Sequence, residues 1–163
     1  MKIELNVNGE DVVLDVEPRR LLADVLRQDL RLYGTHLGCE HGVCGACTIH
    51  LDGEPVRSCL MFAVMAQGHR ITTVEGLGTV ADPHPVQRAF AQEHGLQCGF
   101  CTPGMMMTAR WLLDREPDPD EATIREAISG QLCRCTGYEN IVRAVRWAAQ
   151  HPAAASTQEE VQA

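Results

Sequence analysis

Short alternations of apolar and polar residues fill the first half of the chain and predict a small sheet. Each alternation places its apolar side chains on one face, as a strand packed on a core requires. The turn dipeptides Asn-Gly at 8–9 and Asp-Gly at 52–53 are strong hairpin signals. The predicted strands are 3–7, 11–16, 48–51, 54–58 and 70–74.

One helical period interrupts these alternations. Leu22, Val25 and Leu26 fall at i, i+3 and i+4, which predicts a helix over 21–30 with one buried face. A glycine-rich loop follows it, from residue 34 to 45. The order of hairpin, helix, loop, hairpin and strand favours an α+β unit with one helix crossing the sheet.

The second half has only helical periods, and we expect four helices and no strands there. The predicted helices span 86–94, 104–114, about 121–129 and about 139–150.

Local signals predict where these helices start and stop. Gly95 stands at the C′ position of the first helix, and Thr102 with Pro103 offers an N-cap and N1 proline for the second. Residues 118–121 (DPDE) form a capping-box pattern for the third helix. In the last helix, the apolar side chains expected to face inward are Ile141, Val142, Val145 and Ala149.

These patterns divide the chain into two domains and a tail. We predict a sheet domain over 1–78, a helical domain over 82–151, and a flexible tail over 152–163 that has no apolar period. No internal repeat is present.

Composition and charge exclude several classes of function. The chain carries 14 basic and 22 acidic residues, a net charge of −8, and has no basic run. It is therefore a poor candidate for binding nucleic acid. No apolar stretch approaches the roughly 20 residues of a membrane span, and the N-terminus has no signal-peptide pattern. We expect a cytoplasmic protein, in which clustered cysteines are metal ligands more often than disulfides.

Eight cysteines form two groups of four, with none left over. The first group is spaced C-x4-C-x2-C-x11-C and the second C-x2-C-x31-C-x-C. The first three positions repeat the run by which plant-type ferredoxins hold a [2Fe–2S] cluster, and four thiolates satisfy the two irons of one cluster. The sequence therefore predicts two such clusters, with these ligands: Cys39, Cys44, Cys47 and Cys59; Cys98, Cys101, Cys133 and Cys135.

The residues around the cysteines suit this chemistry. Gly38, Gly42 and Gly45 permit positive φ in a loop that must bend sharply and turn its N–H groups toward sulfur. The second group lies at helix ends, where thiolates gain from free N–H groups and the helix dipole.

Three other interpretations of the cysteines remain open but fit less well. Zinc suits a C-x2-C pair, but C-x-C is an unusual zinc spacing. His41 and His50 suggest a Rieske centre, yet that interpretation would leave Cys44 and Cys59 without a role. We read both histidines instead as a loop residue and an outward-facing strand residue. A disulfide framework would leave 105 connectivities with nothing to choose among them.

The cysteine-bearing segments resemble those of a known family, the small iron–sulfur subunits of the molybdenum hydroxylases, which include xanthine dehydrogenase, aldehyde oxidoreductase and aerobic carbon monoxide dehydrogenase. The resemblance covers about residues 3–149. Its segments are GCEHGVCGACT (38–48), SCLMFA (58–63), ITTVEGL (71–77), LQCGFCTPGMMM (96–107) and LCRCTGYENIV (132–142).

This resemblance implies a β-grasp ferredoxin-like domain followed by a four-helix domain. It implies that the first quartet holds the cluster nearer FAD and the second the cluster nearer molybdenum. It further implies that Gln97 and Cys135 touch the pterin of a molybdenum cofactor bound by a large subunit. FAD would belong to a medium subunit, within a heterotrimer or a dimer of heterotrimers.

We therefore expect an electron-transfer subunit that relays electrons from the molybdopterin site to FAD through two [2Fe–2S] clusters. No catalytic residues are expected on this chain, since no triad, phosphate loop or carboxylate pair stands out. Two alternatives remain, a free-standing two-cluster carrier and a zinc-stabilised interaction module.

The substrate is not encoded here. Two segments resemble the carbon monoxide dehydrogenase branch, but similar subunits serve enzymes for N-heterocycles, aldehydes and acyl-CoA thioesters. Of Met105, Met106 and Met107, we expect at least two in the helical core, because methionine is a common gap-filler.

Overall fold

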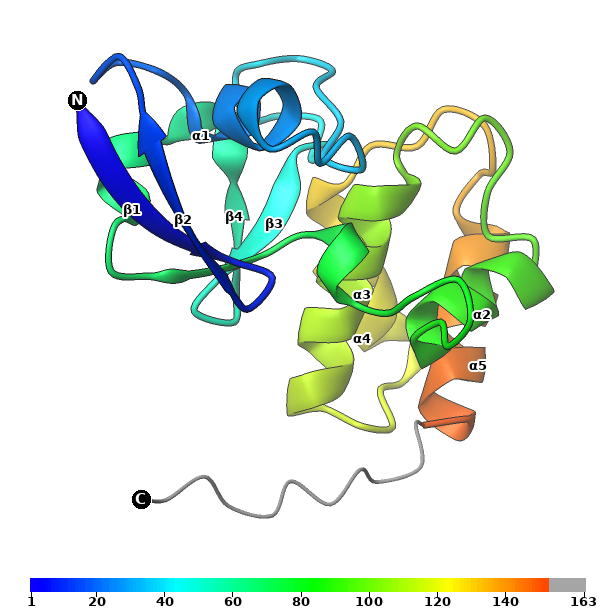
Figure 1. The fold of residues 1–163 in the computed structure, drawn as a ribbon. Helices are drawn as coiled ribbons and strands as arrows, with labels where there is room; N and C mark the ends of the chain where they lie inside the picture. Colours follow the sequence, from blue (N-terminus) through cyan, green and yellow to red (C-terminus); the bar gives the residue numbers. More distant parts are fainter. Residues whose placement is uncertain (153–163) are drawn as a thin grey trace, which may run out of the picture.

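A five-stranded mixed sheet forms the first half of the molecule (Figure 1). The computed structural model describes residues 1–152. The strand order is β2-β1-β5-β3-β4, and neighbours are antiparallel except β1 and β5, which are parallel. Both predicted hairpin turns form, with positive φ at Asn8, Gly9, Asp52 and Gly53. The bounds are β1 Lys2–Val7, β2 Glu10–Asp15, β3 Thr48–Leu51, β4 Glu54–Arg57 and β5 Arg70–Thr72.

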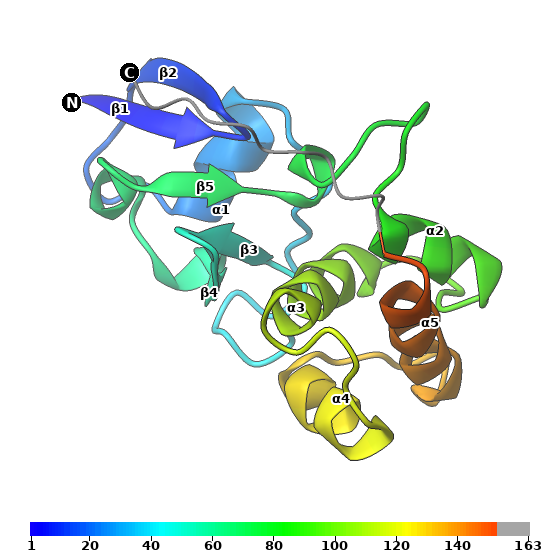
Figure 2. The same ribbon diagram turned by 90° about the horizontal axis from the view of Figure 1, so that it is seen from below.

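One helical segment crosses the sheet and closes its core (Figure 2). It begins as α1 (Leu22–Asp24) and continues as a π-helix over Val25–Asp29, where the Leu30 N–H donates to the Val25 carbonyl. The three apolar residues that predicted this helix are fully buried. The prediction of one regular α-helix was wrong, because most of the segment is a π-helix. Apolar spacing indicates which face of a helix is buried, but it does not distinguish an α-helix from a π-helix.

The last strand is shorter than predicted. β5 ends at Thr72, and Val74–Gly76 form a 3-10 turn instead of extended strand. Thr73 explains the change, since its N–H donates to the side chain of Asn8 at 2.9 Å rather than to a neighbouring strand. The Asn8 side chain therefore ends the strand.

Four helices and no strand make up the second half of the described chain, as predicted. Each packs on another, with α2 against α5 and α3 against α4. Their bounds are α2 Pro85–Gln92, α3 Thr102–Arg115, α4 Glu121–Ala127 and α5 Glu139–Gln150. The α+β architecture is therefore confirmed.

Three predicted helix boundaries were wrong by one or two residues. The left-handed residue after α2 is His94 (φ 52°), while Gly95 packs so closely on Phe90 that a Cβ would lie 3.0 Å from its ring. Cys101, and not Thr102, occupies the N-cap of α3. Asp120 caps α4 by accepting from the Thr123 N–H at 2.8 Å. In each case two adjacent residues carry similar cap signals, and tertiary packing selects between them.

Side-chain burial follows the predicted faces with one exception. Ile141, Val142 and Val145 of α5 are buried, but Ala149 is only half-buried and its neighbour Ala148 is buried instead. The prediction for Ala149 was therefore wrong by one position.

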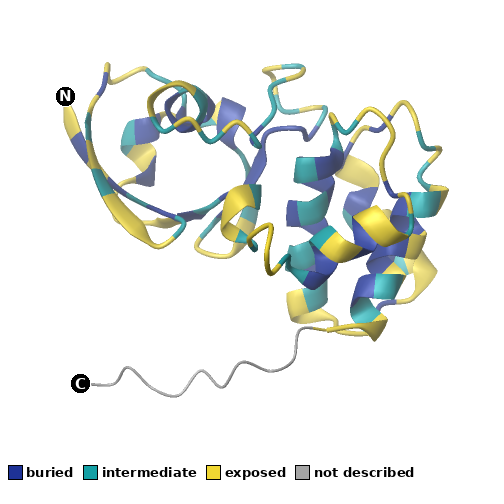
Figure 3. Ribbon diagram, turned by 45° about the vertical axis from the view of Figure 1, so that its right-hand side comes forward, coloured by how far each residue is buried: buried dark blue, intermediate teal, exposed yellow. Residues whose placement is uncertain are grey.

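Helix α3 joins the two halves. It contacts β3 and β4 on one side and α2 and α4 on the other (Figure 3). Met105 and Met107 are fully buried and Met106 is half-buried, which confirms that at least two of the three methionines lie inside. Within residues 1–152, no helix is long and apolar enough to cross a bilayer. The predicted tail lies outside the described residues, apart from Pro152.

Candidate metal centres

The first cysteine quartet lies in the loop between the π-helix and β3, and in the turn after β4. Cys39 and Cys44 are half-buried, while Cys47 and Cys59 are only 2% and 3% exposed. The Cys44 N–H donates to Cys39 Sγ at 3.3 Å. Ser58, beside Cys59, donates its hydroxyl to the Cys47 carbonyl at 2.8 Å. The loop and the turn are thereby held together, with one pair of sulfurs near the surface and one pair inside.

Glycines shape this loop in two different ways. Gly42 and Gly45 have φ of +85° and +79°, the left-handed region that favours glycine. Gly38 does not, and the prediction of positive φ there was wrong. A Cβ at Gly38 would lie 3.1 Å from Cys44 Sγ, so this glycine provides space beside the sulfur.

The second quartet lies where the start of α3 meets the loop before α5. Cys98 and Cys135 are exposed, and their sulfurs are 3.5 Å apart. Cys133 is 8% exposed, and its Sγ lies 3.1 Å from the Thr136 hydroxyl. The thiol of Cys101 contacts that of Cys133. This site therefore also has an outer pair and an inner pair of sulfurs.

All eight cysteines lie in the described part of the chain, and all are free thiols. In residues 1–152 no three potential ligands converge as they would around a single ion. The sulfurs instead stand in pairs, which suits a diiron cluster because each iron takes two thiolates. The four pairs are Cys39 with Cys44, Cys47 with Cys59, Cys98 with Cys135, and Cys101 with Cys133.

Individual thiols of the two sites differ in acidity. Hydrogen bonds from the backbone N–H groups of Cys44 and His41 lower the pKa of Cys39 to about 6. Burial raises the pKa of Cys59 to about 11 and that of Cys101 to about 12. At neutral pH the thiols of Cys59 and Cys101 therefore keep their protons until a metal displaces them, so metal binding at these two residues releases protons.

The structure corrects our interpretation of one histidine. His50 is 5% exposed and points inward, with Nε2 2.7 Å from the Met107 carbonyl. Burial lowers its pKa, so the neutral ring donates this hydrogen bond. The outward prediction was wrong because β3 is covered on both faces, by the apolar core that contains Ile49 and by α3. His41 does lie in the loop, as predicted, with Nδ1 2.5 Å from the Cys39 carbonyl.

Sequence reasoning missed a polar group between the two quartets. Gln131 is 3% exposed, although it belongs to the loop that carries Cys133. Tyr138 was also missed, and its hydroxyl accepts a hydrogen bond from the Cys133 N–H at 2.9 Å. The only signal was position, since each is a polar residue within five positions of a cysteine.

Gln97 lies on the exposed loop that also carries Cys98, at the open side of the second quartet. It shares this exposure with Cys135. The arrangement leaves both residues accessible to a partner on that side.

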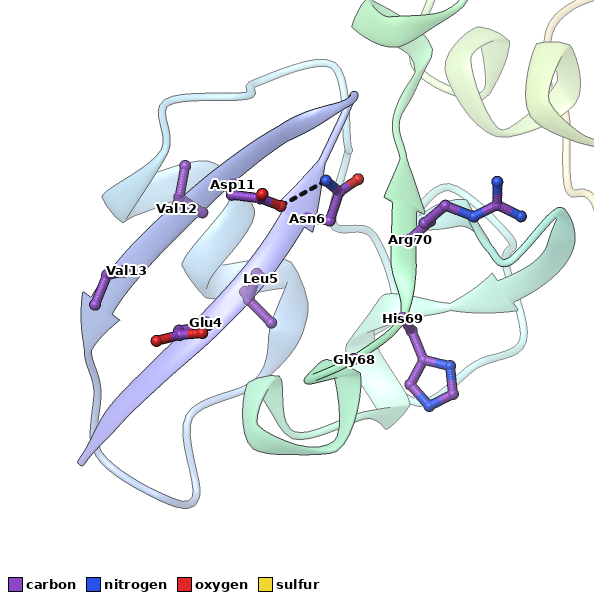
Figure 4. A pocket seen from close by; sticks show the side chains of 9 residues that line it. All are labelled: Glu4, Leu5, Asn6, Asp11, Val12, Val13, Gly68, His69 and Arg70. Carbon is purple, nitrogen blue, oxygen red and sulfur yellow. Dashed lines mark hydrogen bonds between the residues drawn. The ribbon is translucent and has the colours of Figure 1, made fainter. Parts of the chain in front are cut away.

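One hollow of the surface is remote from the cysteines. A pocket of about 370 Å³ opens between β1, β2 and β5, where β1 and β5 pair only through residues 6–7 and 70–71 (Figure 4). Asn6 donates to Asp11 across it at 2.7 Å. Its lining mixes strand side chains with Gly68 and His69 and includes no cysteine, so the pocket is a consequence of the diverging strands.

Comparison with known proteins agrees with this geometry. A family model described as "2Fe-2S iron-sulfur cluster binding domain" matches residues 5–72, and one described as "[2Fe-2S] binding domain" matches 73–146. The gamma subunit of caffeine dehydrogenase from a Pseudomonas species is 57% identical over 147 residues, covering 88% of each chain. The small subunit of nicotine 6-hydroxylase from Paenarthrobacter nicotinovorans is 52% identical, covering 89% of this chain and 87% of the relative.

A solved structure shows the same fold. The crystal structure of quinoline 2-oxidoreductase from Pseudomonas putida 86 contains a chain that is 51% identical, with a TM-score of 0.89. The match covers 92% of this chain and 94% of that one. Sequence, fold and cysteine arrangement thus agree over nearly the whole length. The chain belongs to the family of small [2Fe–2S] subunits of the molybdenum hydroxylases.

Proposed function

We propose that this chain relays electrons from a molybdopterin site to FAD, both on partner subunits, through two [2Fe–2S] clusters. The observation that carries the proposal is the arrangement of eight free thiols as four pairs in two sites. When bound, each cluster supplies reversible one-electron transfer. The proposed ligands are the two quartets named above, one in the domain over 1–78 and one in the domain over 82–151.

The chain's own residues would hold the clusters and shield them from water. Cys47 and Cys59 lie in an apolar cluster with Ala23, beside Leu37. The dry inner side stabilises a bound cluster against hydrolysis, and the loop N–H groups donate toward sulfur. This arrangement supports transfer through the chain without chemistry on it.

The open side of the second site supports contact with the large subunit. Cys98 and Cys135 are the exposed cysteines, and Gln97 is exposed beside them. We propose that Gln97 and Cys135 contact the pterin of the large subunit's molybdenum cofactor. A medium subunit would carry FAD, within a heterotrimer or a dimer of heterotrimers.

The relatives favour one substrate class for the complex. Caffeine, nicotine and quinoline, which name the three proteins above, are all N-heteroaromatic compounds. We propose that the complex containing this chain oxidises an N-heteroaromatic ring. The resemblance of two segments to the carbon monoxide dehydrogenase branch carries less weight than these whole-chain matches.

The test is isolation of the native complex under anaerobic conditions. We expect about four irons with inorganic sulfide per chain, molybdopterin and FAD in the same assembly, and bleaching of the visible absorption by an N-heteroaromatic substrate. A free chain that elutes alone and mediates electron flow would favour the two-cluster carrier. Zinc without iron or colour would favour the interaction module.

Substitutions separate the pterin contact from folding. Gln97→Ala should slow the reduction of the second cluster by substrate while leaving iron content unchanged. Gln92→Ala, an exposed glutamine at the end of α2, is the matched control. Equal rates in the two variants would contradict the assigned role of Gln97.

A further inference from the structure

The two cysteine loops meet at a buried glutamine. Gln131 lies just before Leu132 and Cys133, but its amide reaches the other domain. Assigned from the surrounding network, its NH2 group faces the Gly45 carbonyl at 2.8 Å. Its carbonyl oxygen lies 2.9 Å from the Thr48 hydroxyl and 2.6 Å from the Thr108 hydroxyl. One side chain therefore joins the first cysteine loop, β3, α3 and the second cysteine loop.

Two glycines, which have no Cβ, allow this close approach. A Cβ at Gly45 would lie 2.0 Å from the Gln131 amide and 2.8 Å from the Gly130 carbonyl. A Cβ at Gly104, in the first turn of α3, would lie 2.4 Å from the Gly45 carbonyl. Backbone thus packs directly on backbone where the two sites face each other. Such a contact leaves little room for either loop to shift toward the other.

Two further hydrogen bonds tie the same loops. The Leu132 N–H donates to the Cys44 carbonyl at 2.8 Å, which links a neighbour of Cys133 to a residue of the first quartet. The Arg57 guanidinium donates to the Gly130 carbonyl at 2.7 Å and also faces the Gly42 carbonyl at 3.4 Å. Both contacts connect the domains through groups that adjoin the cysteines.

We propose that Gln131 is a positioning residue for electron transfer. Its amide, supported by Arg57, holds the two cysteine loops at one fixed distance and orientation. The inference rests on the proposed function, because it concerns two clusters in one chain. Transfer between clusters depends steeply on their separation, so a junction that cannot flex keeps the rate uniform. The burial of Gln131 explains why an amide is used, since a buried polar group that satisfies every partner also specifies one arrangement.

The experiment compares Gln131→Met with Gln92→Met in the cluster-loaded native complex. Met has nearly the volume of Gln but removes the amide. With both clusters reduced, EPR should show their magnetic interaction in the wild type and in Gln92→Met. In Gln131→Met the EPR splitting that arises from this interaction should broaden or disappear. The iron content and the signal of each separate cluster should stay normal. Hydrogen exchange of the Leu132 amide should be about tenfold faster in the same variant.

A second variant and a distinct readout keep each outcome decisive. If Gln131→Met does not fold, Arg57→Met tests the same junction, because it removes the bond to Gly130 from a partly exposed side chain. Unchanged magnetic interaction and unchanged Leu132 exchange in the folded variant would overturn the inference. A wild type without iron would refute the proposed function, and Leu132 exchange in that protein would still test the junction.

Discussion

The hydroxyl of Tyr138 accepts a hydrogen bond from the backbone N–H of Cys133 at 2.9 Å. Tyr138 has a left-handed backbone (φ 69°), and its ring folds back over the loop that carries the inner cysteine of the second site. The phenol hydroxyl therefore satisfies the backbone N–H of the buried Cys133, and Tyr138 itself is the N-cap residue of α5. A residue that is not itself a cysteine thus helps to shape the second cysteine site.

Tyr138→Phe removes this acceptor and should lower the free energy of unfolding by about 1 kcal/mol, because the Cys133 N–H loses its partner. Denaturant titration followed by circular dichroism measures the change. Tyr33→Phe is the control, since Tyr33 is 59% exposed and its hydroxyl makes no hydrogen bond within the described chain. Equal losses in the two variants would show that the Tyr138 hydroxyl has no special role.

Cys59→Ser and Cys133→Ser should separate the two clusters. Each removes one ligand of one quartet, so one set of EPR signals should change while the other stays near normal. The iron content should fall from about four toward about two per chain. Both sets of signals disappearing from either folded variant would mean that the cysteines are not grouped in these two quartets.

Gly45→Ala should be far more costly than Gly53→Ala. Both glycines have positive φ, +79° and +87°, so both substitutions carry the left-handed penalty of about 1 kcal/mol. Only the Cβ at Gly45 collides with other groups, and nothing lies within 4 Å of one at Gly53. We expect Gly45→Ala to lose about 3 kcal/mol in total, measured by thermal or chemical unfolding. Similar losses at the two sites would show that the domain junction can relax.

The free energy of unfolding should decrease as the pH is lowered, because of the titration of His84. Burial and then the Arg110 charge lower the pKa of this histidine to about 4, whereas an unfolded chain titrates near 6.5. Between these two pH values His84 is protonated in the unfolded state but not in the folded state. Stability therefore decreases as pH falls from about 6.5 to about 4. His84 is partly exposed, so the effect is on the order of 1 kcal/mol after solvent screening.

His84→Asn is the variant that checks this effect. Asparagine keeps an N-cap acceptor for α2, in place of His84 Nδ1, which accepts from the Val86 N–H at 3.2 Å. The stability of the wild type relative to the variant should be lower at pH 5 than at pH 7. A constant difference across this range would exclude His84 as the titrating group.

The sequence was most informative about features that are local in the chain. Cysteine spacing, hairpin turns such as Asp52-Gly53, and the apolar period of α5 each depend on residues a few positions apart. All of them led to the correct elements. Helix caps were less certain because neighbours such as Asp118 and Asp120 compete for the same role, and only the folded structure selects one.

Contacts between the domains could not be predicted from these patterns. His50 alternates with Ile49 and so was assigned to the solvent face, but α3 covers that face. Gln131 resembles any surface glutamine until Gly45 and Thr48 surround it. Both residues lie where elements that are distant in the chain come into contact. Neither the period of a strand nor the spacing of cysteines predicts such long-range contacts.

The position of β5 in the sheet has a consequence for biosynthesis. β5 is the last strand in the chain but lies at the centre, between β1 and β3. The two hairpins therefore have no common sheet until residue 72 has left the ribosome. By then all four thiols of the first site have already emerged, without a scaffold to hold them. We therefore expect the first cluster to be inserted only after this strand has been translated.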